Sequence, residues 1–383
     1  MITKIKGGKV ISEKEIISAN VYFEDGKIID VTQEKLPFDR EIDARGKYVS
    51  AGFIDIHTHG GNNYDFAKTE DEIVNAANFH LRHGTTSICP TISAAPFKVM
   101  SDAVCEVKKA ILNKKLEANI IGAHLEGPYL SKEQCGAQST DFITEPIEED
   151  YKELITKHGD AIARWTYAPE NDTNGEFCRF LRKNNIIASA GHTNAVYDDM
   201  CIAIEKGCKL ITHLYSCTST VTRKQGFRSL GVIETAMLCD DLYVEIIADG
   251  KHLPPELIKL ILKVKGTDKV ALITDSLALA GSDITHGFMM DTEFIVEDGV
   301  CKLMDRSAFA GSIATADRLI RVMVNEVGVS IAEAVKMMTE VPAKIMGLNK
   351  GKLSPKKDAD IIIFDDNINI LKAFVMGKEI LFI

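Results

Sequence analysis

The sequence lacks several features that mark particular classes of protein. Its 383 residues contain no run of about 18 or more apolar residues, so no membrane span is predicted. The N-terminal segment MITKIKGGKVISEKE has no apolar core of the kind found in signal peptides. There is no long basic run, and the formal net charge is −10, which argues against nucleic acid as a partner. Low-complexity segments and short internal repeats are also missing.

Paired cysteines are missing too. The nine cysteines are scattered, their number is odd, and no Cys-x-x-Cys pair occurs. This usage fits a reducing cytoplasm better than a disulfide framework, so we predict a cytoplasmic protein. Most of the thiols are expected to be small buried apolar groups.

What the chain does have is enough apolar sequence for a large core, since 45% of its residues are hydrophobic. Residues 1–50 and 351–383 both consist of short strand-like runs, with EDG and MGK turns that suggest hairpins. We therefore predict that the two chain ends together build one small β-sandwich domain. Residues 51–350 remain for a larger domain.

The middle of the chain alternates apolar strand-like runs with helical ones. The strand candidates are apolar nearly throughout, as expected for a parallel sheet covered on both faces. They are GFIDIH, TSICPTI, NIIGAHLEG, IARWTYAPE, IIASAGH, KLITHLY, YVEIIADG and KVALITDS. Eight strands, each followed by a helix, predict a (β/α)8 TIM barrel, with a doubly wound open sheet as the second possibility.

The first strand candidate ends in a His-x-His motif. In GFIDIHTHGG, residues two apart on a strand share a face, so His57 and His59 should project together with Asp55 behind them. Two convergent imidazoles resemble half of a metal site. The alternative is that they are ordinary polar residues where a strand meets a turn.

Other polar residues stand at the ends of later strands, where a barrel of this kind carries its chemistry. Six of the ten histidines fall at such ends, and the other four (His80, His83, His158 and His286) are predicted to be surface residues. Singly, each strand-end residue could be a partner for a loop carbonyl or a helix cap. Together they favour a metal cluster. The strand-end residues are His57, His59, His124, Glu126, His192, His213, Asp249, His252 and Asp275.

These motifs resemble those of the amidohydrolase superfamily, and within it the N-acetylglucosamine-6-phosphate deacetylase family. The similar segments are GFIDIHTHG, HLEGPYL, AGHT, THLY, IADGKHL, TDSLALAG and AGS at 310–312, in the family's order over nearly the whole chain. The resemblance implies a metal-dependent hydrolase that removes an acetyl group from a phosphorylated amino sugar, commonly as a homodimer. One or two divalent ions are implied, zinc or iron first, with manganese or cobalt as alternatives.

The resemblance also implies roles for individual residues. Glu126, His192 and His213 would hold the main metal, and His57 and His59 a second one that only some members have. Asp275 would be the catalytic acid/base. The substrate would be contacted by Arg228, His252, Gln138, Ser216, Cys217 and Gly311. In some relatives an arginine or histidine of the neighbouring subunit reaches the phosphate.

The sequence departs from the family pattern on the substrate side. Ser216-Cys217-Thr218 replaces Asn-Ala-Met, Gln138 replaces a histidine, and Arg228 begins RSLG in place of Arg-Glu-Pro-Gly. Backbone amides at the 216–218 turn can still receive a phosphate, and Arg228 can still grip one. N-acetylgalactosamine-6-phosphate is therefore an alternative substrate.

Two further hypotheses stay open. Another amidohydrolase, such as a cyclic-amide hydrolase or a deaminase, would usually need a bridging lysine after the fourth strand, where the chain reads YAPE. A non-catalytic binding protein on the same barrel would be expected to lose ligands or the acid/base, and this sequence has kept them.

Overall fold

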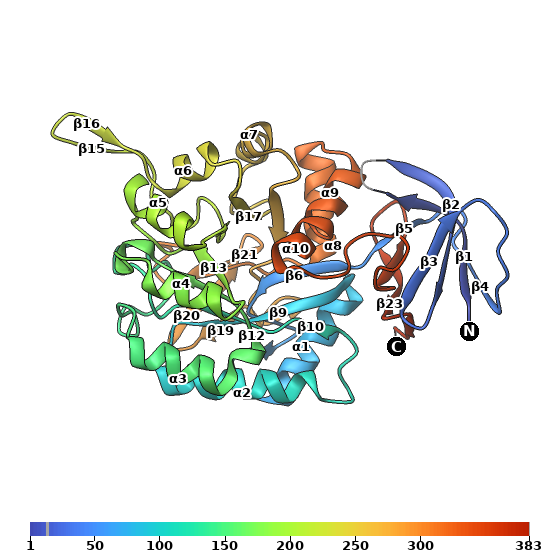
Figure 1. Ribbon diagram of the computed structural model, residues 1–383, viewed down its shortest axis with the longest axis horizontal. Coiled ribbons are helices and arrows are strands. Elements are labelled where there is room, and N and C mark those ends of the chain that lie inside the picture. The colour runs from blue at the N-terminus through green and yellow to red at the C-terminus, as the bar shows by residue number, and fades with distance from the viewer. Residues whose placement is uncertain (13–14, 383) are drawn as a thin grey trace.

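The computed structural model describes residues 1–12 and 15–382 and has two parts (Figure 1). A β-sandwich lies at one end of the molecule, where both chain termini are found, and a larger α/β barrel forms the rest. None of the helices among the described residues is both long and apolar enough to cross a membrane.

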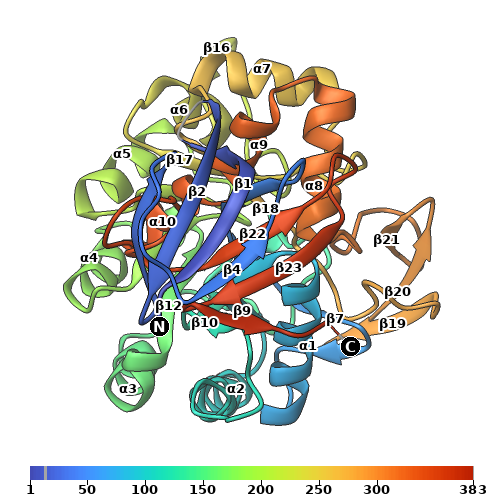
Figure 2. The same cartoon turned by 90° about the vertical axis from the view of Figure 1, so that its right-hand side faces the viewer.

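Both ends of the chain contribute to one eight-stranded sheet, folded into the sandwich (Figure 2). Its order is β24-β23-β22-β5-β1-β2-β3, with β4 paired to β1. The N- and C-terminal segments meet where β22 runs antiparallel to β5 and Ile361 lies opposite Ala51. The strands are β1 (Thr3–Ile11), β2 (Ile16–Glu24), β3 (Lys27–Thr32), β4 (Arg40–Asp43), β5 (Tyr48–Ala51), β22 (Ile361–Phe364), β23 (Ile370–Val375) and β24 (Lys378–Ile380).

The larger part is a near-closed barrel of eight parallel strands, which confirms the predicted (β/α)8 fold and rules out the doubly wound sheet. Neighbouring strands pair in parallel in the order in which they follow along the chain. All eight strand candidates are present: β6 (Phe53–Thr58), β9 (Thr85–Ser93), β11 (Ala123–Glu126), β12 (Ile162–Tyr167), β13 (Ile187–Ala190), β14 (Leu210–Ile211), β17 (Tyr243–Ile247) and β18 (Val270–Ile273). The short β10 (Asn119–Ile120) pairs in parallel with the first half of β9, ahead of β11.

Helices surround the barrel and bury its outer face (Figures 1 and 2). They are α1 (Glu70–Arg82), α2 (Phe97–Ile111), α3 (Glu148–His158), α4 (Glu176–Lys183), α5 (Tyr197–Lys206), α6 (Val232–Leu238), α7 (Pro255–Lys265), α8 (Ala316–Val322), α9 (Ile331–Met337) and α10 (Glu340–Met346). A π-helical turn, Met323–Val327, follows α8, and short 3-10 turns lie at Lys132–Gln134, Gly159–Ala161 and Pro169–Asn171. Most of the helices present an apolar stripe to the strands, and these stripes join one continuous core.

Three insertions decorate the barrel. A small ribbon, β7 (Gly60–Gly61) with β8 (Tyr64–Asp65), follows β6. The hairpin of β15 (Thr222–Lys224) and β16 (Phe227–Ser229) projects from the molecule (Figure 1). A three-stranded sheet, β19 (His286–Met289), β20 (Thr292–Glu297) and β21 (Val300–Leu303), packs Phe294 against Leu277 and Ala310 near the barrel mouth.

One prediction about histidines is wrong. His80 was expected on the surface, but it is fully buried on the inner side of α1, where its Nε2 lies 2.9 Å from Gly60 O. The apolar stripe of α1 carries this position inward because residues three and four apart share a helix face. Nothing in the sequence around His80 indicated that a polar residue would lie on the buried apolar face of α1.

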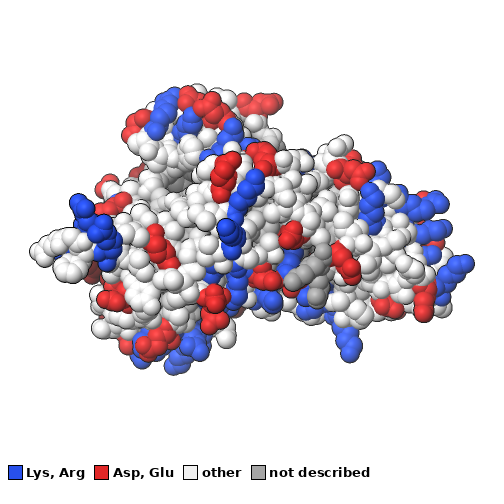
Figure 3. Space-filling view, turned by 90° about the horizontal axis from the view of Figure 1, so that it is seen from above, with Lys and Arg blue, Asp and Glu red and all other residues white. Residues whose placement is uncertain are grey.

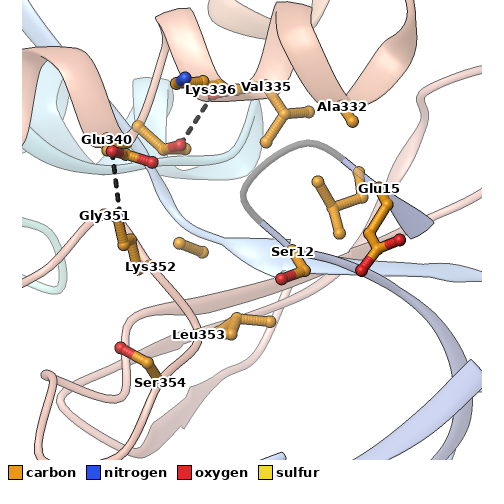
Figure 4. A pocket seen from close by; sticks show the side chains of 13 residues that line it. Ser12, Glu15, Ala332, Val335, Lys336, Glu340, Gly351, Lys352, Leu353 and Ser354 are labelled. Carbon is orange, nitrogen blue, oxygen red and sulfur yellow. Dashed lines mark hydrogen bonds and ion pairs between the residues drawn. The ribbon is translucent and has the colours of Figure 1, made fainter. Parts of the chain in front are cut away.

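A cavity of about 510 Å³ lies between the sandwich and the barrel (Figure 4). Its wall includes Ala51, just before β6 begins, so it lies at the amino-terminal end of the barrel strands. Three charged residues of its wall are engaged in ion pairs: Lys352 with Glu340 (3.0 Å), and Lys336 with Asp268. In barrels of this kind the chemistry is found at the opposite, carboxyl end of the strands.

Candidate metal centre and active site

The predicted strand-end residues converge at the carboxyl end of the barrel. His57 lies in β6, Glu126 ends β11, and His192, His213 and Asp275 follow β13, β14 and β18. The last three residues have positive φ values of 47°, 27° and 47°. Such left-handed backbone is costly for non-glycine residues and is concentrated at functional sites. Here it turns each side chain inward as its strand ends.

The convergent residues form two adjoining groups. Glu126, His192 and His213 are one group, and His57, His59 and Asp275 are the other; all are buried, and the ligand atoms within each group lie within 4.8 Å of one another. Glu126 Oε1 is 3.2 Å from His192 Nε2 and 3.0 Å from His213 Nε2. It is also 3.4 Å from His57 Nε2, so the carboxylate links the two groups.

The histidine tautomers suit a cation in the first group. His192 Nδ1 lies 2.8 Å from Gln134 O and His213 Nδ1 lies 3.1 Å from Ser216 O. A carbonyl oxygen only accepts, so both Nδ1 atoms donate, and a neutral ring then directs its Nε2 lone pair at the centre. These two Nε2 atoms are 3.2 Å apart. Facing lone pairs repel, and a cation bound between them and the Glu126 carboxylate removes the repulsion.

The charge of the site also favours a cation. Burial opposes a charge on His57, but the Glu126 and Asp275 carboxylates outweigh it and raise the pKa of His57 to about 10. Burial likewise opposes a charge on His59, and the same carboxylates raise the pKa of His59 to about 9. Burial would raise the pKa of Glu126, yet the neighbouring histidines, His57 first, hold it well below its usual range. The buried carboxylates therefore favour positive charge beside them, either protons on the histidine rings or a metal ion.

A buried ion pair that we did not predict lies beneath the second group. Arg164 in β12 and Glu245 in β17 form a salt bridge and have no exposed surface. Glu245 Oε2 lies 3.6 Å from His57 Nδ1, and Arg164 Nη1 donates to Ile56 O at 3.1 Å. A carboxylate behind a ring orients it toward a metal. The available signal was a single charge inside each of two otherwise apolar strands, ARWTY and YVEII.

His124 lies outside both groups. Its Nδ1 is 3.0 Å from Thr91 Oγ1 and its Nε2 is 2.7 Å from Thr166 Oγ1. Both ring nitrogens are thus occupied by hydroxyl groups in the barrel interior. Burial, together with the Arg164 charge, holds the pKa of His124 well below its usual range, so the ring is neutral. Its place at a strand end reflects packing under the site.

A pocket of about 270 Å³ opens onto the two groups. Asp249 anchors His252 in its wall, since His252 Nδ1 is 2.9 Å from Asp249 Oδ2. The wall combines polar side chains with a hydrophobic side formed by Ile247, Met289 and Phe309. Five of the six residues predicted to contact substrate line it: Gln138, Ser216, Cys217, His252 and Gly311.

The sixth, Arg228, lies elsewhere. It is exposed on β16, and its Nη1 donates to Gly226 O at 3.1 Å within the same hairpin. The hairpin projects away from the body of the chain (Figure 1). Arg228 is therefore not brought to the pocket of its own chain.

A near-closed (β/α)8 barrel with histidine and carboxylate groups at its carboxyl end is typical of metal-dependent hydrolases. The chain belongs to the Amidohydrolase family, whose family model matches residues 48–380. It is 33% identical over 385 residues to the N-acetylglucosamine-6-phosphate deacetylase of Bacillus subtilis (strain 168), covering 98% of this chain and 96% of that protein.

Two further similarities bear on the site. The chain is 30% identical over 331 residues to the N-acetylgalactosamine-6-phosphate deacetylase of Shewanella sp. (strain ANA-3), covering 86% of this chain and 82% of that one. The crystal structure of N-acetylglucosamine-6-phosphate deacetylase from Pasteurella multocida matches with a TM-score of 0.92 at 30% identity, over 99% of this chain and 100% of that chain.

Proposed function

We propose that this chain is a metal-dependent hydrolase that removes the acetyl group from N-acetylglucosamine-6-phosphate, giving glucosamine-6-phosphate and acetate. The observation that carries the proposal is the pair of histidine–carboxylate groups facing one pocket of about 270 Å³. The family and the relatives named above support the same reaction. We assign the catalysis to residues 51–350.

In this proposal Glu126, His192 and His213 hold the main divalent ion, and His57 and His59 contribute to a second position. When bound, the ion supplies Lewis-acid polarisation of the amide carbonyl and lowers the pKa of the attacking water. Imidazole and carboxylate suit zinc or iron best here, and also accept manganese or cobalt. The two carbonyl-bound Nδ1 atoms keep the Nε2 atoms of His192 and His213 directed at the ion.

Asp275 acts as the catalytic acid/base. Its Oδ1 lies 3.2 Å from His59 Nε2 and 3.4 Å from His57 Nε2, and the residue also lines the pocket. Burial would raise the pKa of Asp275, but the neighbouring histidine charges, led by His57, outweigh it and lower the pKa. The carboxylate is therefore ionised and can accept a proton from water. It then hands a proton to the departing amine, which is a poor leaving group as an anion.

The sugar is held by the other pocket residues. His252, fixed through its Nδ1, offers Nε2 to a hydroxyl or to the carbonyl oxygen. The backbone N–H of Cys217 is offered to the phosphate, whereas the N–H of Ser216 donates to His213 O at 2.9 Å and shapes this turn. Gly311 has φ 109°, and a Cβ there would lie 3.0 Å from Asp275 O and 3.1 Å from Leu277 Cγ, so the backbone of this wall packs closely against the 275–277 segment. We assign the contact with the acyl group to this part of the wall.

We further propose a homodimer in which Arg228 reaches the partner's pocket. The hairpin of β15 and β16 carries Arg223, Lys224 and Arg228, and its basic side chains stand out at the left edge of Figure 3. Phe227 beside them is 80% exposed. Exposed apolar side chains rimmed by charge are typical of protein interfaces. A second copy would cover Phe227 and receive Arg228 as a phosphate ligand.

N-acetylgalactosamine-6-phosphate is the second candidate substrate. It is favoured by the similarity to the Shewanella protein and by the Ser216-Cys217-Thr218 departure at the pocket wall. The two sugars differ in the orientation of one hydroxyl. We also propose a cytoplasmic location, because all nine cysteines are unpaired in the structure.

The test is acetate release by the purified, metal-reconstituted chain. N-acetylglucosamine-6-phosphate, N-acetylgalactosamine-6-phosphate and the two unphosphorylated sugars are compared side by side. The proposal expects the highest kcat/KM with N-acetylglucosamine-6-phosphate. Preference for the galactosamine epimer selects the second candidate. Equal inactivity on all four, in a chain that binds metal, contradicts both and leaves other N-acyl compounds or a binding protein.

A further inference from the structure

Gln138 bridges two strand ends of the barrel beside the first ligand group. Its side-chain Oε1 accepts from the backbone N–H of Ala94, just after β9, at 2.7 Å. Its Nε2 donates to Glu126 Oε2 at 2.9 Å. A backbone N–H can only donate, so the amide has one possible orientation, and its NH2 group faces Glu126. Gln138 is 6% exposed, and both ends of its amide are occupied by protein atoms.

The two oxygens of the Glu126 carboxylate face different partners. Oε1 faces His192 and His213, at 3.2 Å and 3.0 Å. Oε2 faces Gln138 and His59, the latter at 3.3 Å. The last torsion of a glutamate is soft, so a carboxylate without a partner samples many orientations. The hydrogen bond from Gln138 restricts that rotation and keeps Oε1 directed at the two histidines.

Little of the Gln138 amide remains for a ligand. Nε2 carries two hydrogens: one points to Glu126 Oε2 and the other to the backbone oxygen of Glu126, at a longer 3.4 Å. A sugar hydroxyl would have to compete with a charged acceptor for the first hydrogen, and hydrogen bonds to charged groups are the stronger ones. The glutamine that replaces the family's histidine is therefore better placed to support a metal ligand than to read the substrate.

We propose that Gln138 is a positioning residue for Glu126: its hydrogen bond to Oε2 orients the carboxylate for the metal held with His192 and His213. This reassigns a residue that the sequence suggested as a substrate contact. The inference rests on the proposed metal role of Glu126. Outer partners that orient metal ligands typically change metal affinity about 10- to 100-fold when they are removed.

The test compares Gln138→Met with the wild-type chain in cobalt(II) and zinc(II) binding. Methionine keeps the length and volume of the side chain but donates nothing. Cobalt binding is followed by its visible absorption, which reports the ligand geometry, and zinc binding by equilibrium dialysis. The matched control is Gln33→Met, at an exposed glutamine just after β3, because its side-chain amide donates to Ser18 O at 3.0 Å and not to Glu126. If Gln138→Met does not fold, Gln138→Asn replaces it, since its shorter amide cannot reach both Ala94 and Glu126.

Positioning predicts metal affinity at least ~10-fold weaker in the Gln138 variant, an altered cobalt spectrum, and unchanged binding in Gln33→Met. At saturating metal, KM for the phosphosugar should stay within about threefold of wild type while kcat falls. Wild-type metal affinity combined with a raised KM overturns the inference and returns Gln138 to the substrate. If Glu126→Gln binds metal as tightly as the wild-type chain, or if the wild-type chain binds no metal, the proposed metal role of Glu126 is itself overturned.

Discussion

The backbone N–H of Asp275 donates to the carbonyl oxygen of His57 at 3.0 Å, which joins the last barrel strand to the first. Beside it, Thr274 Oγ1 donates to Asp55 Oδ2 at 2.6 Å, and His59 N donates to Ser276 O at 2.8 Å. The barrel is therefore closed by the same residues, or their direct neighbours, that line the site. The relative positions of the acid/base and the His-x-His pair follow from the closure of the barrel itself.

The first prediction concerns the ligands. Glu126→Gln and His192→Ala should each lose metal and activity together, because each removes a donor from a group whose atoms lie within 4.8 Å of one another. Metal content after dialysis and acetate release are measured on the same samples. His286→Ala, a change at an exposed histidine, is the control and should keep both. Retained activity in a metal-free Glu126→Gln chain would contradict the proposed chemistry.

The second prediction separates the acid/base from the ligands. Asp275→Asn keeps the size of the side chain but cannot take a proton from water. It should retain metal at the Glu126 group and lower kcat about a hundredfold or more. Metal content and kcat at saturating substrate are compared with the wild-type chain. A near-wild-type rate in this variant would remove Asp275 from the mechanism. If neither the wild-type chain nor Asp275→Asn is active and both bind metal equally, the result would favour a binding protein.

The fold could be predicted in outline because its signals are local and repeated. Eight apolar runs separated by helical segments predict parallel strands without any knowledge of contacts. The two ligand groups could also be predicted, because carboxyl ends of barrel strands meet at one face. His57, Glu126 and Asp275 were each singled out by being polar at the end of an apolar run.

The remaining features depend on contacts that no local pattern encodes. The burial of His80 follows from the rotation of α1 against the barrel. The engagement of Gln138 with Glu126 depends on a loop folding back over β11. The separation of Arg228 from the pocket depends on the length and direction of a hairpin. Pairings between Arg164 and Glu245 join strands 81 residues apart in sequence.

The third prediction tests the role of Arg228, on the hairpin of β15 and β16, in the proposed dimer. Arg228→Gln should raise KM for the phosphosugar about tenfold or more, since a charge-assisted contact to phosphate is worth about 1.5–3 kcal/mol. KM for the unphosphorylated sugar should not change. Lys98→Gln is the control, because it removes an exposed positive charge on α2, outside both the hairpin and the pocket wall.

Mixing two impaired variants decides whether Arg228 acts across the dimer. Arg228→Gln and Asp275→Asn chains are unfolded together and refolded as a mixture, then assayed at low phosphosugar concentration. If Arg228 acts in the partner's pocket, a mixed dimer has one complete site and activity rises above that of either parent. If the arginine serves its own chain, neither site is complete and the mixture gives only the average of the two.

The fourth prediction is a pH dependence of stability that comes from His80. Burial lowers the pKa of His80 from 6.5 to about 4. Above pH ~6.5 the ring is neutral in both the folded and the unfolded chain, so it contributes no pH dependence there. Between pH ~6.5 and 4 the His80 ring is protonated in the unfolded chain but not in the folded chain. The free energy of unfolding therefore falls as the pH falls, by at most about 3 kcal/mol at ~1.4 kcal/mol per pH unit. Urea unfolding of metal-free protein at several pH values measures this loss.

His80→Gln should show a flatter dependence of the unfolding free energy on pH across that window, whereas His286→Gln, at an exposed site, should follow the wild type. If the unfolding free energy of His80→Gln depends as steeply on pH as that of the wild type, other groups cause the loss of stability and the pKa of His80 is not lowered in the folded chain.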